Sequence, residues 1–93
     1  MAYLLIKGRV KDFAEWKQIF DQNSSMRKKH GCLGEQVFHE SGNPKSLIIL
    51  FEWDNLDNAR TFNESDDLKQ AMKDAGAIEK KSFFLDKIET GPA

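Results

Sequence analysis

The segment LIILFEW, Leu47–Trp53, carries an apolar side chain at every position except Glu52. Successive side chains of a strand point to opposite faces of a sheet, so its odd-numbered residues share one face and Ile48 and Leu50 lie on the other. A small antiparallel sheet usually buries one face under helices and leaves the other to water, which alternates apolar and polar residues. A strand without that alternation predicts that both faces of the sheet are covered.

The chain has 93 residues, which predicts one domain spanning residues 1–93. A domain of this size buries only about 60–65% of its unfolded surface, so a partner chain would add stability. The net charge of −1 offers no basic surface, and we expect neither a nucleic acid nor a membrane as partner. No signal peptide and no apolar run of about 20 residues is present, so we expect a cytoplasmic protein.

The residues that usually hold metals are sparse. Cys32 is the only cysteine, which excludes an intrachain disulfide and a cysteine metal cluster and favours a small buried apolar residue. His30 and His39 lie far apart, without a carboxylate at ligand spacing. We therefore expect no metal and no cofactor.

The order of predicted elements indicates the fold. Asp12 followed by Glu15 resembles a capping box, Gly31 suits a helix C-terminus, and Ser65 suits the start of a later helix. Predicted strands cover 3–10, 32–40, 46–53 and 81–89, with a loop at 41–45, and predicted helices cover 12–30, 55–63 and 66–75. The order β-α-β-β-α-β, with the second helix broken at 63–65, is the ferredoxin-like plan, an α+β fold. Its four-stranded antiparallel sheet carries the helices on one face.

The other face of such a sheet stays bare in a single chain. Strand 46–53 has apolar residues on both faces, and the last strand adds Phe83, Phe84 and Leu85, which also fall on both faces. A second copy packed sheet against sheet is the simplest cover. We therefore expect a homodimer.

Three stretches carry a family resemblance: GRVKDFAEWKQIF, GCLGEQVF and LIILFEWDNLDNARTFNESDDLKQAMKDAG. They resemble the dimeric α/β-barrel superfamily and, more narrowly, small antibiotic-biosynthesis-monooxygenase-like proteins. The most telling part is the strand ending in EW, followed by an A-R-x-F helix, a Ser cap and L-K-x-A-M-K-x-A-G. The resemblance implies a dimeric α/β barrel. Enzymes of this group include cofactor-independent oxygenases of phenols or quinols and heme-degrading oxygenases, which bind flat aromatic molecules between the sheet and the helices of each subunit.

The resemblance argues against heme chemistry. Heme degraders of this superfamily use an Asn on the first strand, a Trp on the second helical segment and a His one helix further on. An approximate correspondence puts Lys7, Phe62 and Met72 at those places. The phenol oxidases use Asn, Trp, Tyr and Arg at varied positions, for which Trp53 and Arg60 are loose counterparts.

The predicted hairpin suggests a ligand face. If Glu40 pairs with Ser46, one face collects a mixture of apolar and polar residues, as ligand pockets do. This face would consist of Gly34, Gln36, Phe38, Ile48, Leu50 and Glu52. Glu52 is our candidate catalytic base, because burial would raise the pKa of its carboxyl and let it accept a phenol proton. The alternative is that Glu52 sits at a strand end, solvated or paired with a lysine.

Other residues complete the predicted pocket. Trp16 and Trp53 would stack on a planar ligand, with a place in the core or an interface as the alternative. Arg60 would hold an anionic group, unless it simply faces solvent. The full predicted ligand pocket is Trp16, Gln36, Phe38, Trp53, Arg60 and Phe62. Two functions stay open: cofactor-independent monooxygenation of a small aromatic compound, and a non-catalytic small-molecule-binding or structural homodimer.

Overall fold

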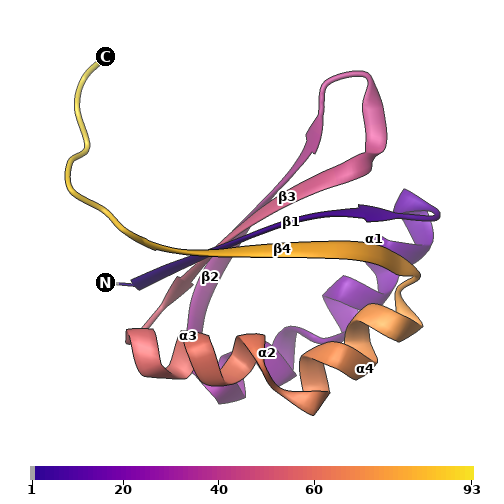
Figure 1. The fold of residues 1–93 in the computed structure, drawn as a ribbon, viewed down its shortest axis with the longest axis horizontal. Coiled ribbons are helices and arrows are strands. Elements are labelled where there is room, and N and C mark those ends of the chain that lie inside the picture. The colour runs from indigo at the N-terminus through magenta and orange to yellow at the C-terminus, as the bar shows by residue number, and fades with distance from the viewer. Residues whose placement is uncertain (1) are drawn as a thin grey trace.

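A computed structural model describes residues 2–93 and gives the element order that the sequence predicts. The elements are β1 (Ala2–Val10), α1 (Phe13–Gln22), α2 (Ser24–His30), β2 (Cys32–Glu40), β3 (Asn43–Trp53), α3 (Leu56–Asn63), α4 (Asp66–Asp74) and β4 (Ala77–Asp86). In these residues the strands form one antiparallel sheet in the order β2-β3-β1-β4, and the helices all lie on one side of it (Figure 1). The ferredoxin-like α+β prediction is confirmed.

The prediction of one helix over 12–30 is wrong at its middle. Helix α1 ends at Gln22 and α2 begins at Ser24. Between them, the side-chain amide of Asn23 donates to the carbonyl oxygen of Ile19 at 2.8 Å, and its backbone N–H reaches the same carbonyl at 3.2 Å. Asn competes with regular helical hydrogen bonding in this way. The chain therefore turns at Asn23, and α2 is a separate short helix.

Two predicted helix starts are confirmed by their hydrogen bonds. The Asp12 carboxylate accepts the backbone N–H of Glu15 at 2.9 Å, and the Ser65 hydroxyl accepts that of Leu68 at 3.1 Å. Each bond satisfies a backbone donor that the first turn of a helix leaves free. These caps fix where α1 and α4 begin.

The junction of α2 with β2 lies against the start of α3. Gly31 ends α2 with φ of 107°, and a Cβ at this position would lie 2.6 Å from a carboxylate oxygen of Asp54. Only glycine combines this conformation with this close contact. Asn55 caps α3, because the Asn55 side-chain oxygen accepts the backbone N–H of Asn58 at 2.8 Å.

The β2–β3 hairpin has the predicted register over most of its length. Gln36 pairs with Leu50 and Phe38 with Ile48, but a bulge then shifts Glu40 onto Asn43. The loop predicted at 41–45 is wrong, since only residues 41 and 42 form the turn and β3 begins at Asn43. Pro44 has no backbone N–H to donate to the neighbouring strand, and it lies where the pairing of β2 with β3 is irregular.

Strand β4 begins and ends earlier than the predicted 81–89. It covers Ala77–Asp86, because pairing with β1 extends the strand back through Lys80 and Glu79 to Ala77. Gly8 allows this pairing, since a Cβ there would meet the carbonyl oxygen of Glu79 at 2.2 Å. Residues 87–93 leave the sheet as an extended tail on the side away from the helices (Figure 1), and Ile88 in this tail is 97% exposed.

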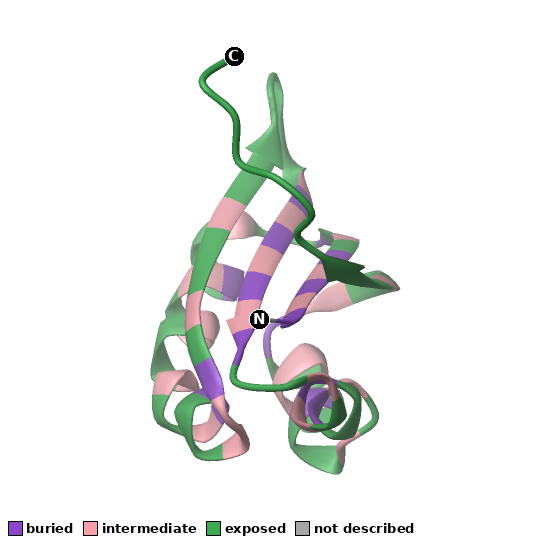
Figure 2. Ribbon diagram, turned by 90° about the vertical axis from the view of Figure 1, so that its left-hand side faces the viewer, coloured by how far each residue is buried: buried purple, intermediate pink, exposed green. Residues whose placement is uncertain are grey.

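The core lies between the sheet and the helices. Burial alternates along β1 and β3, so one face of each strand is buried (Figure 2). The largest fully buried side chains are Trp53, Phe62, Leu4 and Leu47. Burying a large apolar side chain contributes about 1.5–3 kcal/mol, so this face supplies most of the hydrophobic stabilisation of a single chain.

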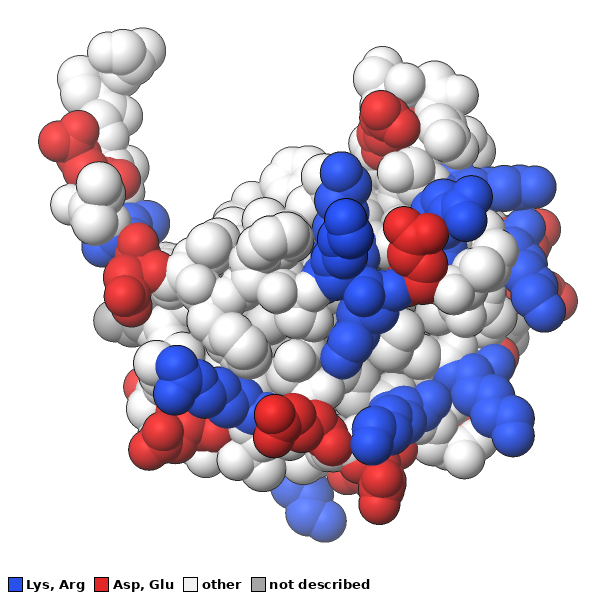
Figure 3. All heavy atoms as spheres, in the orientation of Figure 1, with Lys and Arg blue, Asp and Glu red and all other residues white. Residues whose placement is uncertain are grey.

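The opposite face of the sheet, which we call the open face, is uncovered in a single chain. It carries Tyr3, Leu5, Phe38, Ile48, Leu50, Phe83 and Leu85. Phe38 is 49% exposed, Phe83 47% and Leu85 39%. Uncharged atoms gather on this side between the hairpin and the C-terminal tail (Figure 3). The homodimer that would cover this face stays a prediction.

Candidate functional site

A cavity of about 70 Å³ lies between the sheet and the helices, lined by residues of β1, α1, α2, β3, α3, α4 and β4. Aromatic rings from three elements form a continuous wall. The rings of Trp16 and Phe20 stack with centroids 4.7 Å apart, Phe20 lies 6.2 Å from Phe51, and Phe51 lies 5.9 Å from Phe62. Met26 and Met72 add adaptable thioethers. The lining of the cavity is therefore mostly apolar and aromatic.

Polar side chains lie only at two places in this wall, among residues 2–93. Asn23 and Arg27 come from the α1–α2 break and from α2, while Arg9 and Glu79 come from β1 and β4. Arg9 and Glu79 form an ion pair of 3.1 Å with both side chains about half exposed. Such an exposed pair contributes little, about 0–1 kcal/mol. The buried polar position of the cavity is the one at Arg27.

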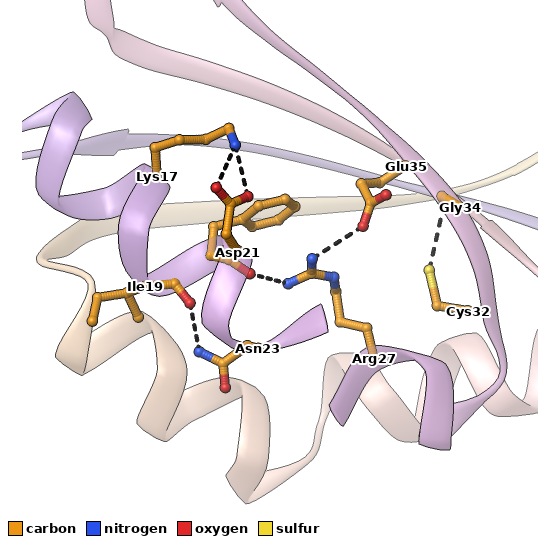
Figure 4. A network of polar contacts seen from close by, with 9 residues as sticks. Lys17, Ile19, Asp21, Asn23, Arg27, Cys32, Gly34 and Glu35 are labelled. Carbon is orange, nitrogen blue, oxygen red and sulfur yellow. Dashed lines mark hydrogen bonds and ion pairs between the residues drawn. The ribbon is translucent and has the colours of Figure 1, made fainter. Parts of the chain in front are cut away.

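Arg27 is a charged side chain only 6% exposed to solvent. Its Nη1 donates to the carbonyl oxygen of Phe20 at 2.7 Å, and its Nη2 donates to Oε1 of Glu35 at 3.0 Å (Figure 4). The guanidinium carbon lies 3.8 Å from the centroid of the Phe20 ring, a cation–π contact. Within residues 2–93, the buried Nε has no hydrogen-bond partner. The site thus holds one buried cation with an unused donor.

A shallow groove of about 390 Å³ lies on the outer side of Arg27, lined by Lys17, Phe20, Asp21, Ser24, Arg27, Glu35 and Val37. Phe20 and Arg27 line both the groove and the cavity. The stacked pair of Phe20 and Arg27 is therefore the partition between the two spaces. Lys17 and Asp21, one turn apart on α1, form an ion pair of 2.6 Å in the wall of the groove.

The structure brings together only part of the predicted pocket. Trp16 and Phe62 both line the cavity. Trp53 lies on the same face of the sheet, fully buried, with its ring 4.9 Å from that of Phe62, but it does not line the cavity. Its place in the core is the alternative that the sequence left open.

The remaining predicted pocket residues lie elsewhere. Gln36, Phe38 and Glu52 are on the open face, with the sheet between them and the cavity. Glu52 pairs with Tyr3 of β1 and is half-buried. Arg60 is exposed on α3, with its guanidinium 5.7 Å from the Phe84 ring. A ligand in the cavity is therefore out of reach of Glu52, and the catalytic role of Glu52 stays a prediction for the open face alone.

Sequence reasoning missed Arg27. It stands within the run RKKH at the end of a helix, where cations are expected for the helix dipole. The available signal was its spacing, since Arg27 follows Phe20 by seven residues, about two helical turns on the same face. Glu35, its partner on β2, is brought close only by the tertiary fold.

Two side chains, Cys32 and Lys80, have shifted pKa values. Burial raises the pKa of the Cys32 thiol, which donates to the carbonyl oxygen of Gly34 at 3.4 Å, so Cys32 is a buried apolar residue as expected. Burial and the nearby Lys69 lower the pKa of Lys80, whose ammonium bonds the backbone and side-chain oxygens of Asn63 at 3.0 Å. This contact ties the end of α3 to β4.

Other site types find no support in the part of the chain that the structure describes. Residues 2–93 contain no group of three or more His, Cys, Asp or Glu side chains that could hold a metal ion. Within the same residues, no helix is both long and apolar enough to cross a membrane.

The chain is a small α+β protein with an aromatic-walled cavity between a ferredoxin-like sheet and its helices. A family model described as antibiotic biosynthesis monooxygenase matches residues 4–74, and the chain belongs to that family. The resemblance noted in the sequence is thereby confirmed. No curated protein matches the sequence.

Solved structures share this fold at low identity. SnoaB, described as a cofactor-independent oxygenase from Streptomyces nogalater, has a TM-score of 0.81 at 13% identity and covers 99% of this chain and 97% of its own. A Deinococcus radiodurans protein named for the same family has a TM-score of 0.74 at 19% identity, covering 100% and 98%. A conserved protein from Methanosarcina mazei has a TM-score of 0.70 at 22% identity, covering 92% and 91%.

Proposed function

We propose that this protein is a cofactor-independent monooxygenase that oxidises a small phenolic or quinol compound and works as a homodimer. The single observation that carries the proposal is the aromatic-walled cavity with one buried polar position, Arg27. Membership of the monooxygenase family supports it, and so does the fold shared with SnoaB, which is described as a cofactor-independent oxygenase.

The chemistry of such a reaction asks little of the protein beyond binding and electrostatics. A phenol with a free ring position reacts with dioxygen to give a quinone and water, so the substrate supplies all the electrons. The slow step begins when the phenol loses its proton, because the phenolate is the better electron donor. A buried cation such as Arg27 would favour the phenolate and lower the pKa of a phenol bound beside it.

The cavity is small, so either the substrate must be very small or side chains around the cavity must move to admit it. An engineered apolar cavity of about 150 Å³ binds benzene, which is more than this cavity offers. Drug-sized ligands fill pockets of about 300–1,000 Å³. We therefore propose that the Phe20–Arg27 partition opens toward the groove when an aromatic ring binds.

A specific observation favours a second candidate, a non-catalytic small-molecule-binding protein. Among residues 2–93, Glu79 is the only carboxylate lining the cavity, and no histidine lines it. Glu79 is already paired with Arg9. A general base typically contributes about 10²–10⁴ in rate, so a cavity without one suits binding better than proton abstraction.

Tryptophan fluorescence tests the site, since Trp16 lines the cavity and Trp53 does not. Titration with hydroquinone or a hydroxynaphthalene should quench fluorescence saturably. The Trp16→Phe variant should lose most of the saturable signal, and the matched Trp53→Phe variant should keep it. Equal quenching by both variants would contradict binding in the cavity.

Oxygen uptake separates the two candidates. A monooxygenase should consume dioxygen with the bound compound and release the matching quinone. Saturable binding without oxygen uptake over a panel of phenols and quinols would favour the binding protein.

A further inference from the structure

In the Phe20–Arg27 partition, the Arg27 guanidinium has one buried N–H donor, on Nε, without a hydrogen-bond partner among residues 2–93. The guanidinium of arginine presents Nε–H and one Nη2–H side by side, a fork that matches the two oxygens of a carboxylate. In Arg27, Nη1 is held by the carbonyl oxygen of Phe20, which leaves the Nε and Nη2 side of the fork. Glu35 uses only one oxygen on Nη2, and Nε has no partner within residues 2–93. Half of the fork is therefore empty.

The position of this fork matters because Arg27 faces two spaces. It lines both the aromatic cavity and the outer groove. The Glu35 side chain is 31% exposed, whereas the Arg27 side chain is 6% exposed. Glu35 can turn into water at small cost, but the Arg27 charge must keep an anionic partner. A charged ligand can thus exchange with Glu35.

The geometry points to a site for a small aromatic carboxylate at this partition. The carboxylate replaces Glu35 on Arg27, bonding Nε and Nη2 together, and the ring lies against Phe20 toward the cavity. This inference rests on the proposed function in one respect, that the cavity takes an aromatic ring. It adds an acidic substituent to the compounds that the site selects.

The charged side chains that line the groove show whether net charge alone could attract a carboxylate. Lys17 and Asp21 cancel each other as a pair at 2.6 Å, and Arg27 and Glu35 cancel as a second pair. The groove therefore attracts no anion by net charge. Selection of a carboxylate has to come from the Arg27 fork. Lys28 is exposed on α2 next to Arg27 and lines neither the groove nor the cavity, so it is the matched control.

Benzoate and its neutral analogue benzamide are the probes, measured by calorimetric titration of the intact protein. The wild-type protein should bind benzoate more tightly than benzamide. The Arg27→Gln variant should lose about 10- to 100-fold in benzoate affinity, the usual range for a hydrogen bond to a charged group, with little change for benzamide. The Lys28→Gln variant should keep the preference for benzoate.

The Glu35→Gln variant should change benzoate affinity in the opposite direction. This test still works if the Arg27→Gln variant fails to fold. Without the competing carboxylate, benzoate should bind about two- to fivefold more tightly. Weaker or unchanged benzoate binding in Glu35→Gln would overturn the exchange, as would equal binding of benzoate and benzamide by the wild-type protein. If hydroquinone still binds in that case, the proposed function survives. If no aromatic compound binds at millimolar concentration, both fail.

Discussion

The two faces of the sheet are similarly apolar but differ in how they are covered. On the face under the helices, Phe51 and Trp53 are 2% and 0% exposed, because α1 and α3 pack against them. On the open face, Phe38 and Phe83 stay 49% and 47% exposed. The first face stabilises a single chain by itself. The second can contribute only when something covers it, so its apolar residues indicate assembly rather than subunit stability.

The charges on the open face differ from those near the cavity. Lys7 of β1 lies directly opposite Lys81 of β4, and like charges in that arrangement destabilise a sheet. Under the helices, the buried charge of Arg27 is matched by Glu35 and by a backbone carbonyl. The open face therefore carries a repulsive pair of lysines as well as uncovered apolar side chains. Acidic side chains of a second copy packed on this face would reduce the repulsion.

Removing a ring from the covered face should have the largest effect. We expect Phe51→Ala to lower the free energy of unfolding by about 3–5 kcal/mol, through lost burial and a cavity in the core. Urea unfolding measures this change. Phe38→Ala, on the open face, is the matched variant and should cost the subunit less than about 1 kcal/mol where the chain is monomeric. Equal losses in the two variants would break the comparison between the faces.

A charge placed on the open face should act on assembly instead. We expect Leu50→Asp to weaken the predicted homodimer by more than about 2 kcal/mol, because a residue at the centre of the predicted interface would become a buried unpaired charge. Sedimentation at several concentrations measures this shift. The control Lys28→Asp changes the charge further, on an exposed position of α2, and should leave assembly unchanged. Dimerisation of Leu50→Asp at wild-type affinity would place the interface elsewhere.

The smallest expected effect concerns Cys32, which is buried at the start of β2. Because its pKa is raised in the folded chain, the unfolded chain loses the thiol proton first as the pH rises. Its contribution to stability is therefore complete below the unfolded pKa, about 8.5, and falls as the pH rises from there through the folded pKa. Cys32→Ala should unfold with a flatter alkaline decline, measured by urea unfolding from pH 7 to 10. An unchanged slope would contradict the assigned burial effect.

Much of the fold is predictable from local patterns. Helix starts at Asp12 and Ser65 follow from side chains that cap their own first turn, and the break near 63–65 follows from the residues present there. The turn at Asn23 escaped because the apolar spacing continues across it. The early start of β4 escaped because it depends on pairing with β1, which local sequence does not reveal.

The candidate site is less predictable than the fold. The hairpin register gave the sets of residues that share a face, but not which face the helices cover. Glu52 and Gln36 were grouped correctly with Leu50 and yet lie across the sheet from the cavity. Phe51 and Trp53 belong to the other set of residues. These two large aromatic side chains could have indicated that their face is the one that the helices cover. The contact of Arg27 with Glu35 joins α2 to β2 and needs the three-dimensional arrangement.

The mass of the wild-type protein in solution tests the central claim most directly, which is that the open face is an interface with a second copy. Light scattering at micromolar concentration measures it without any substitution. The account predicts twice the mass of the chain. A chain that has the mass of one copy and remains fully folded down to nanomolar concentration would contradict it, because the open face would then be stable in contact with water.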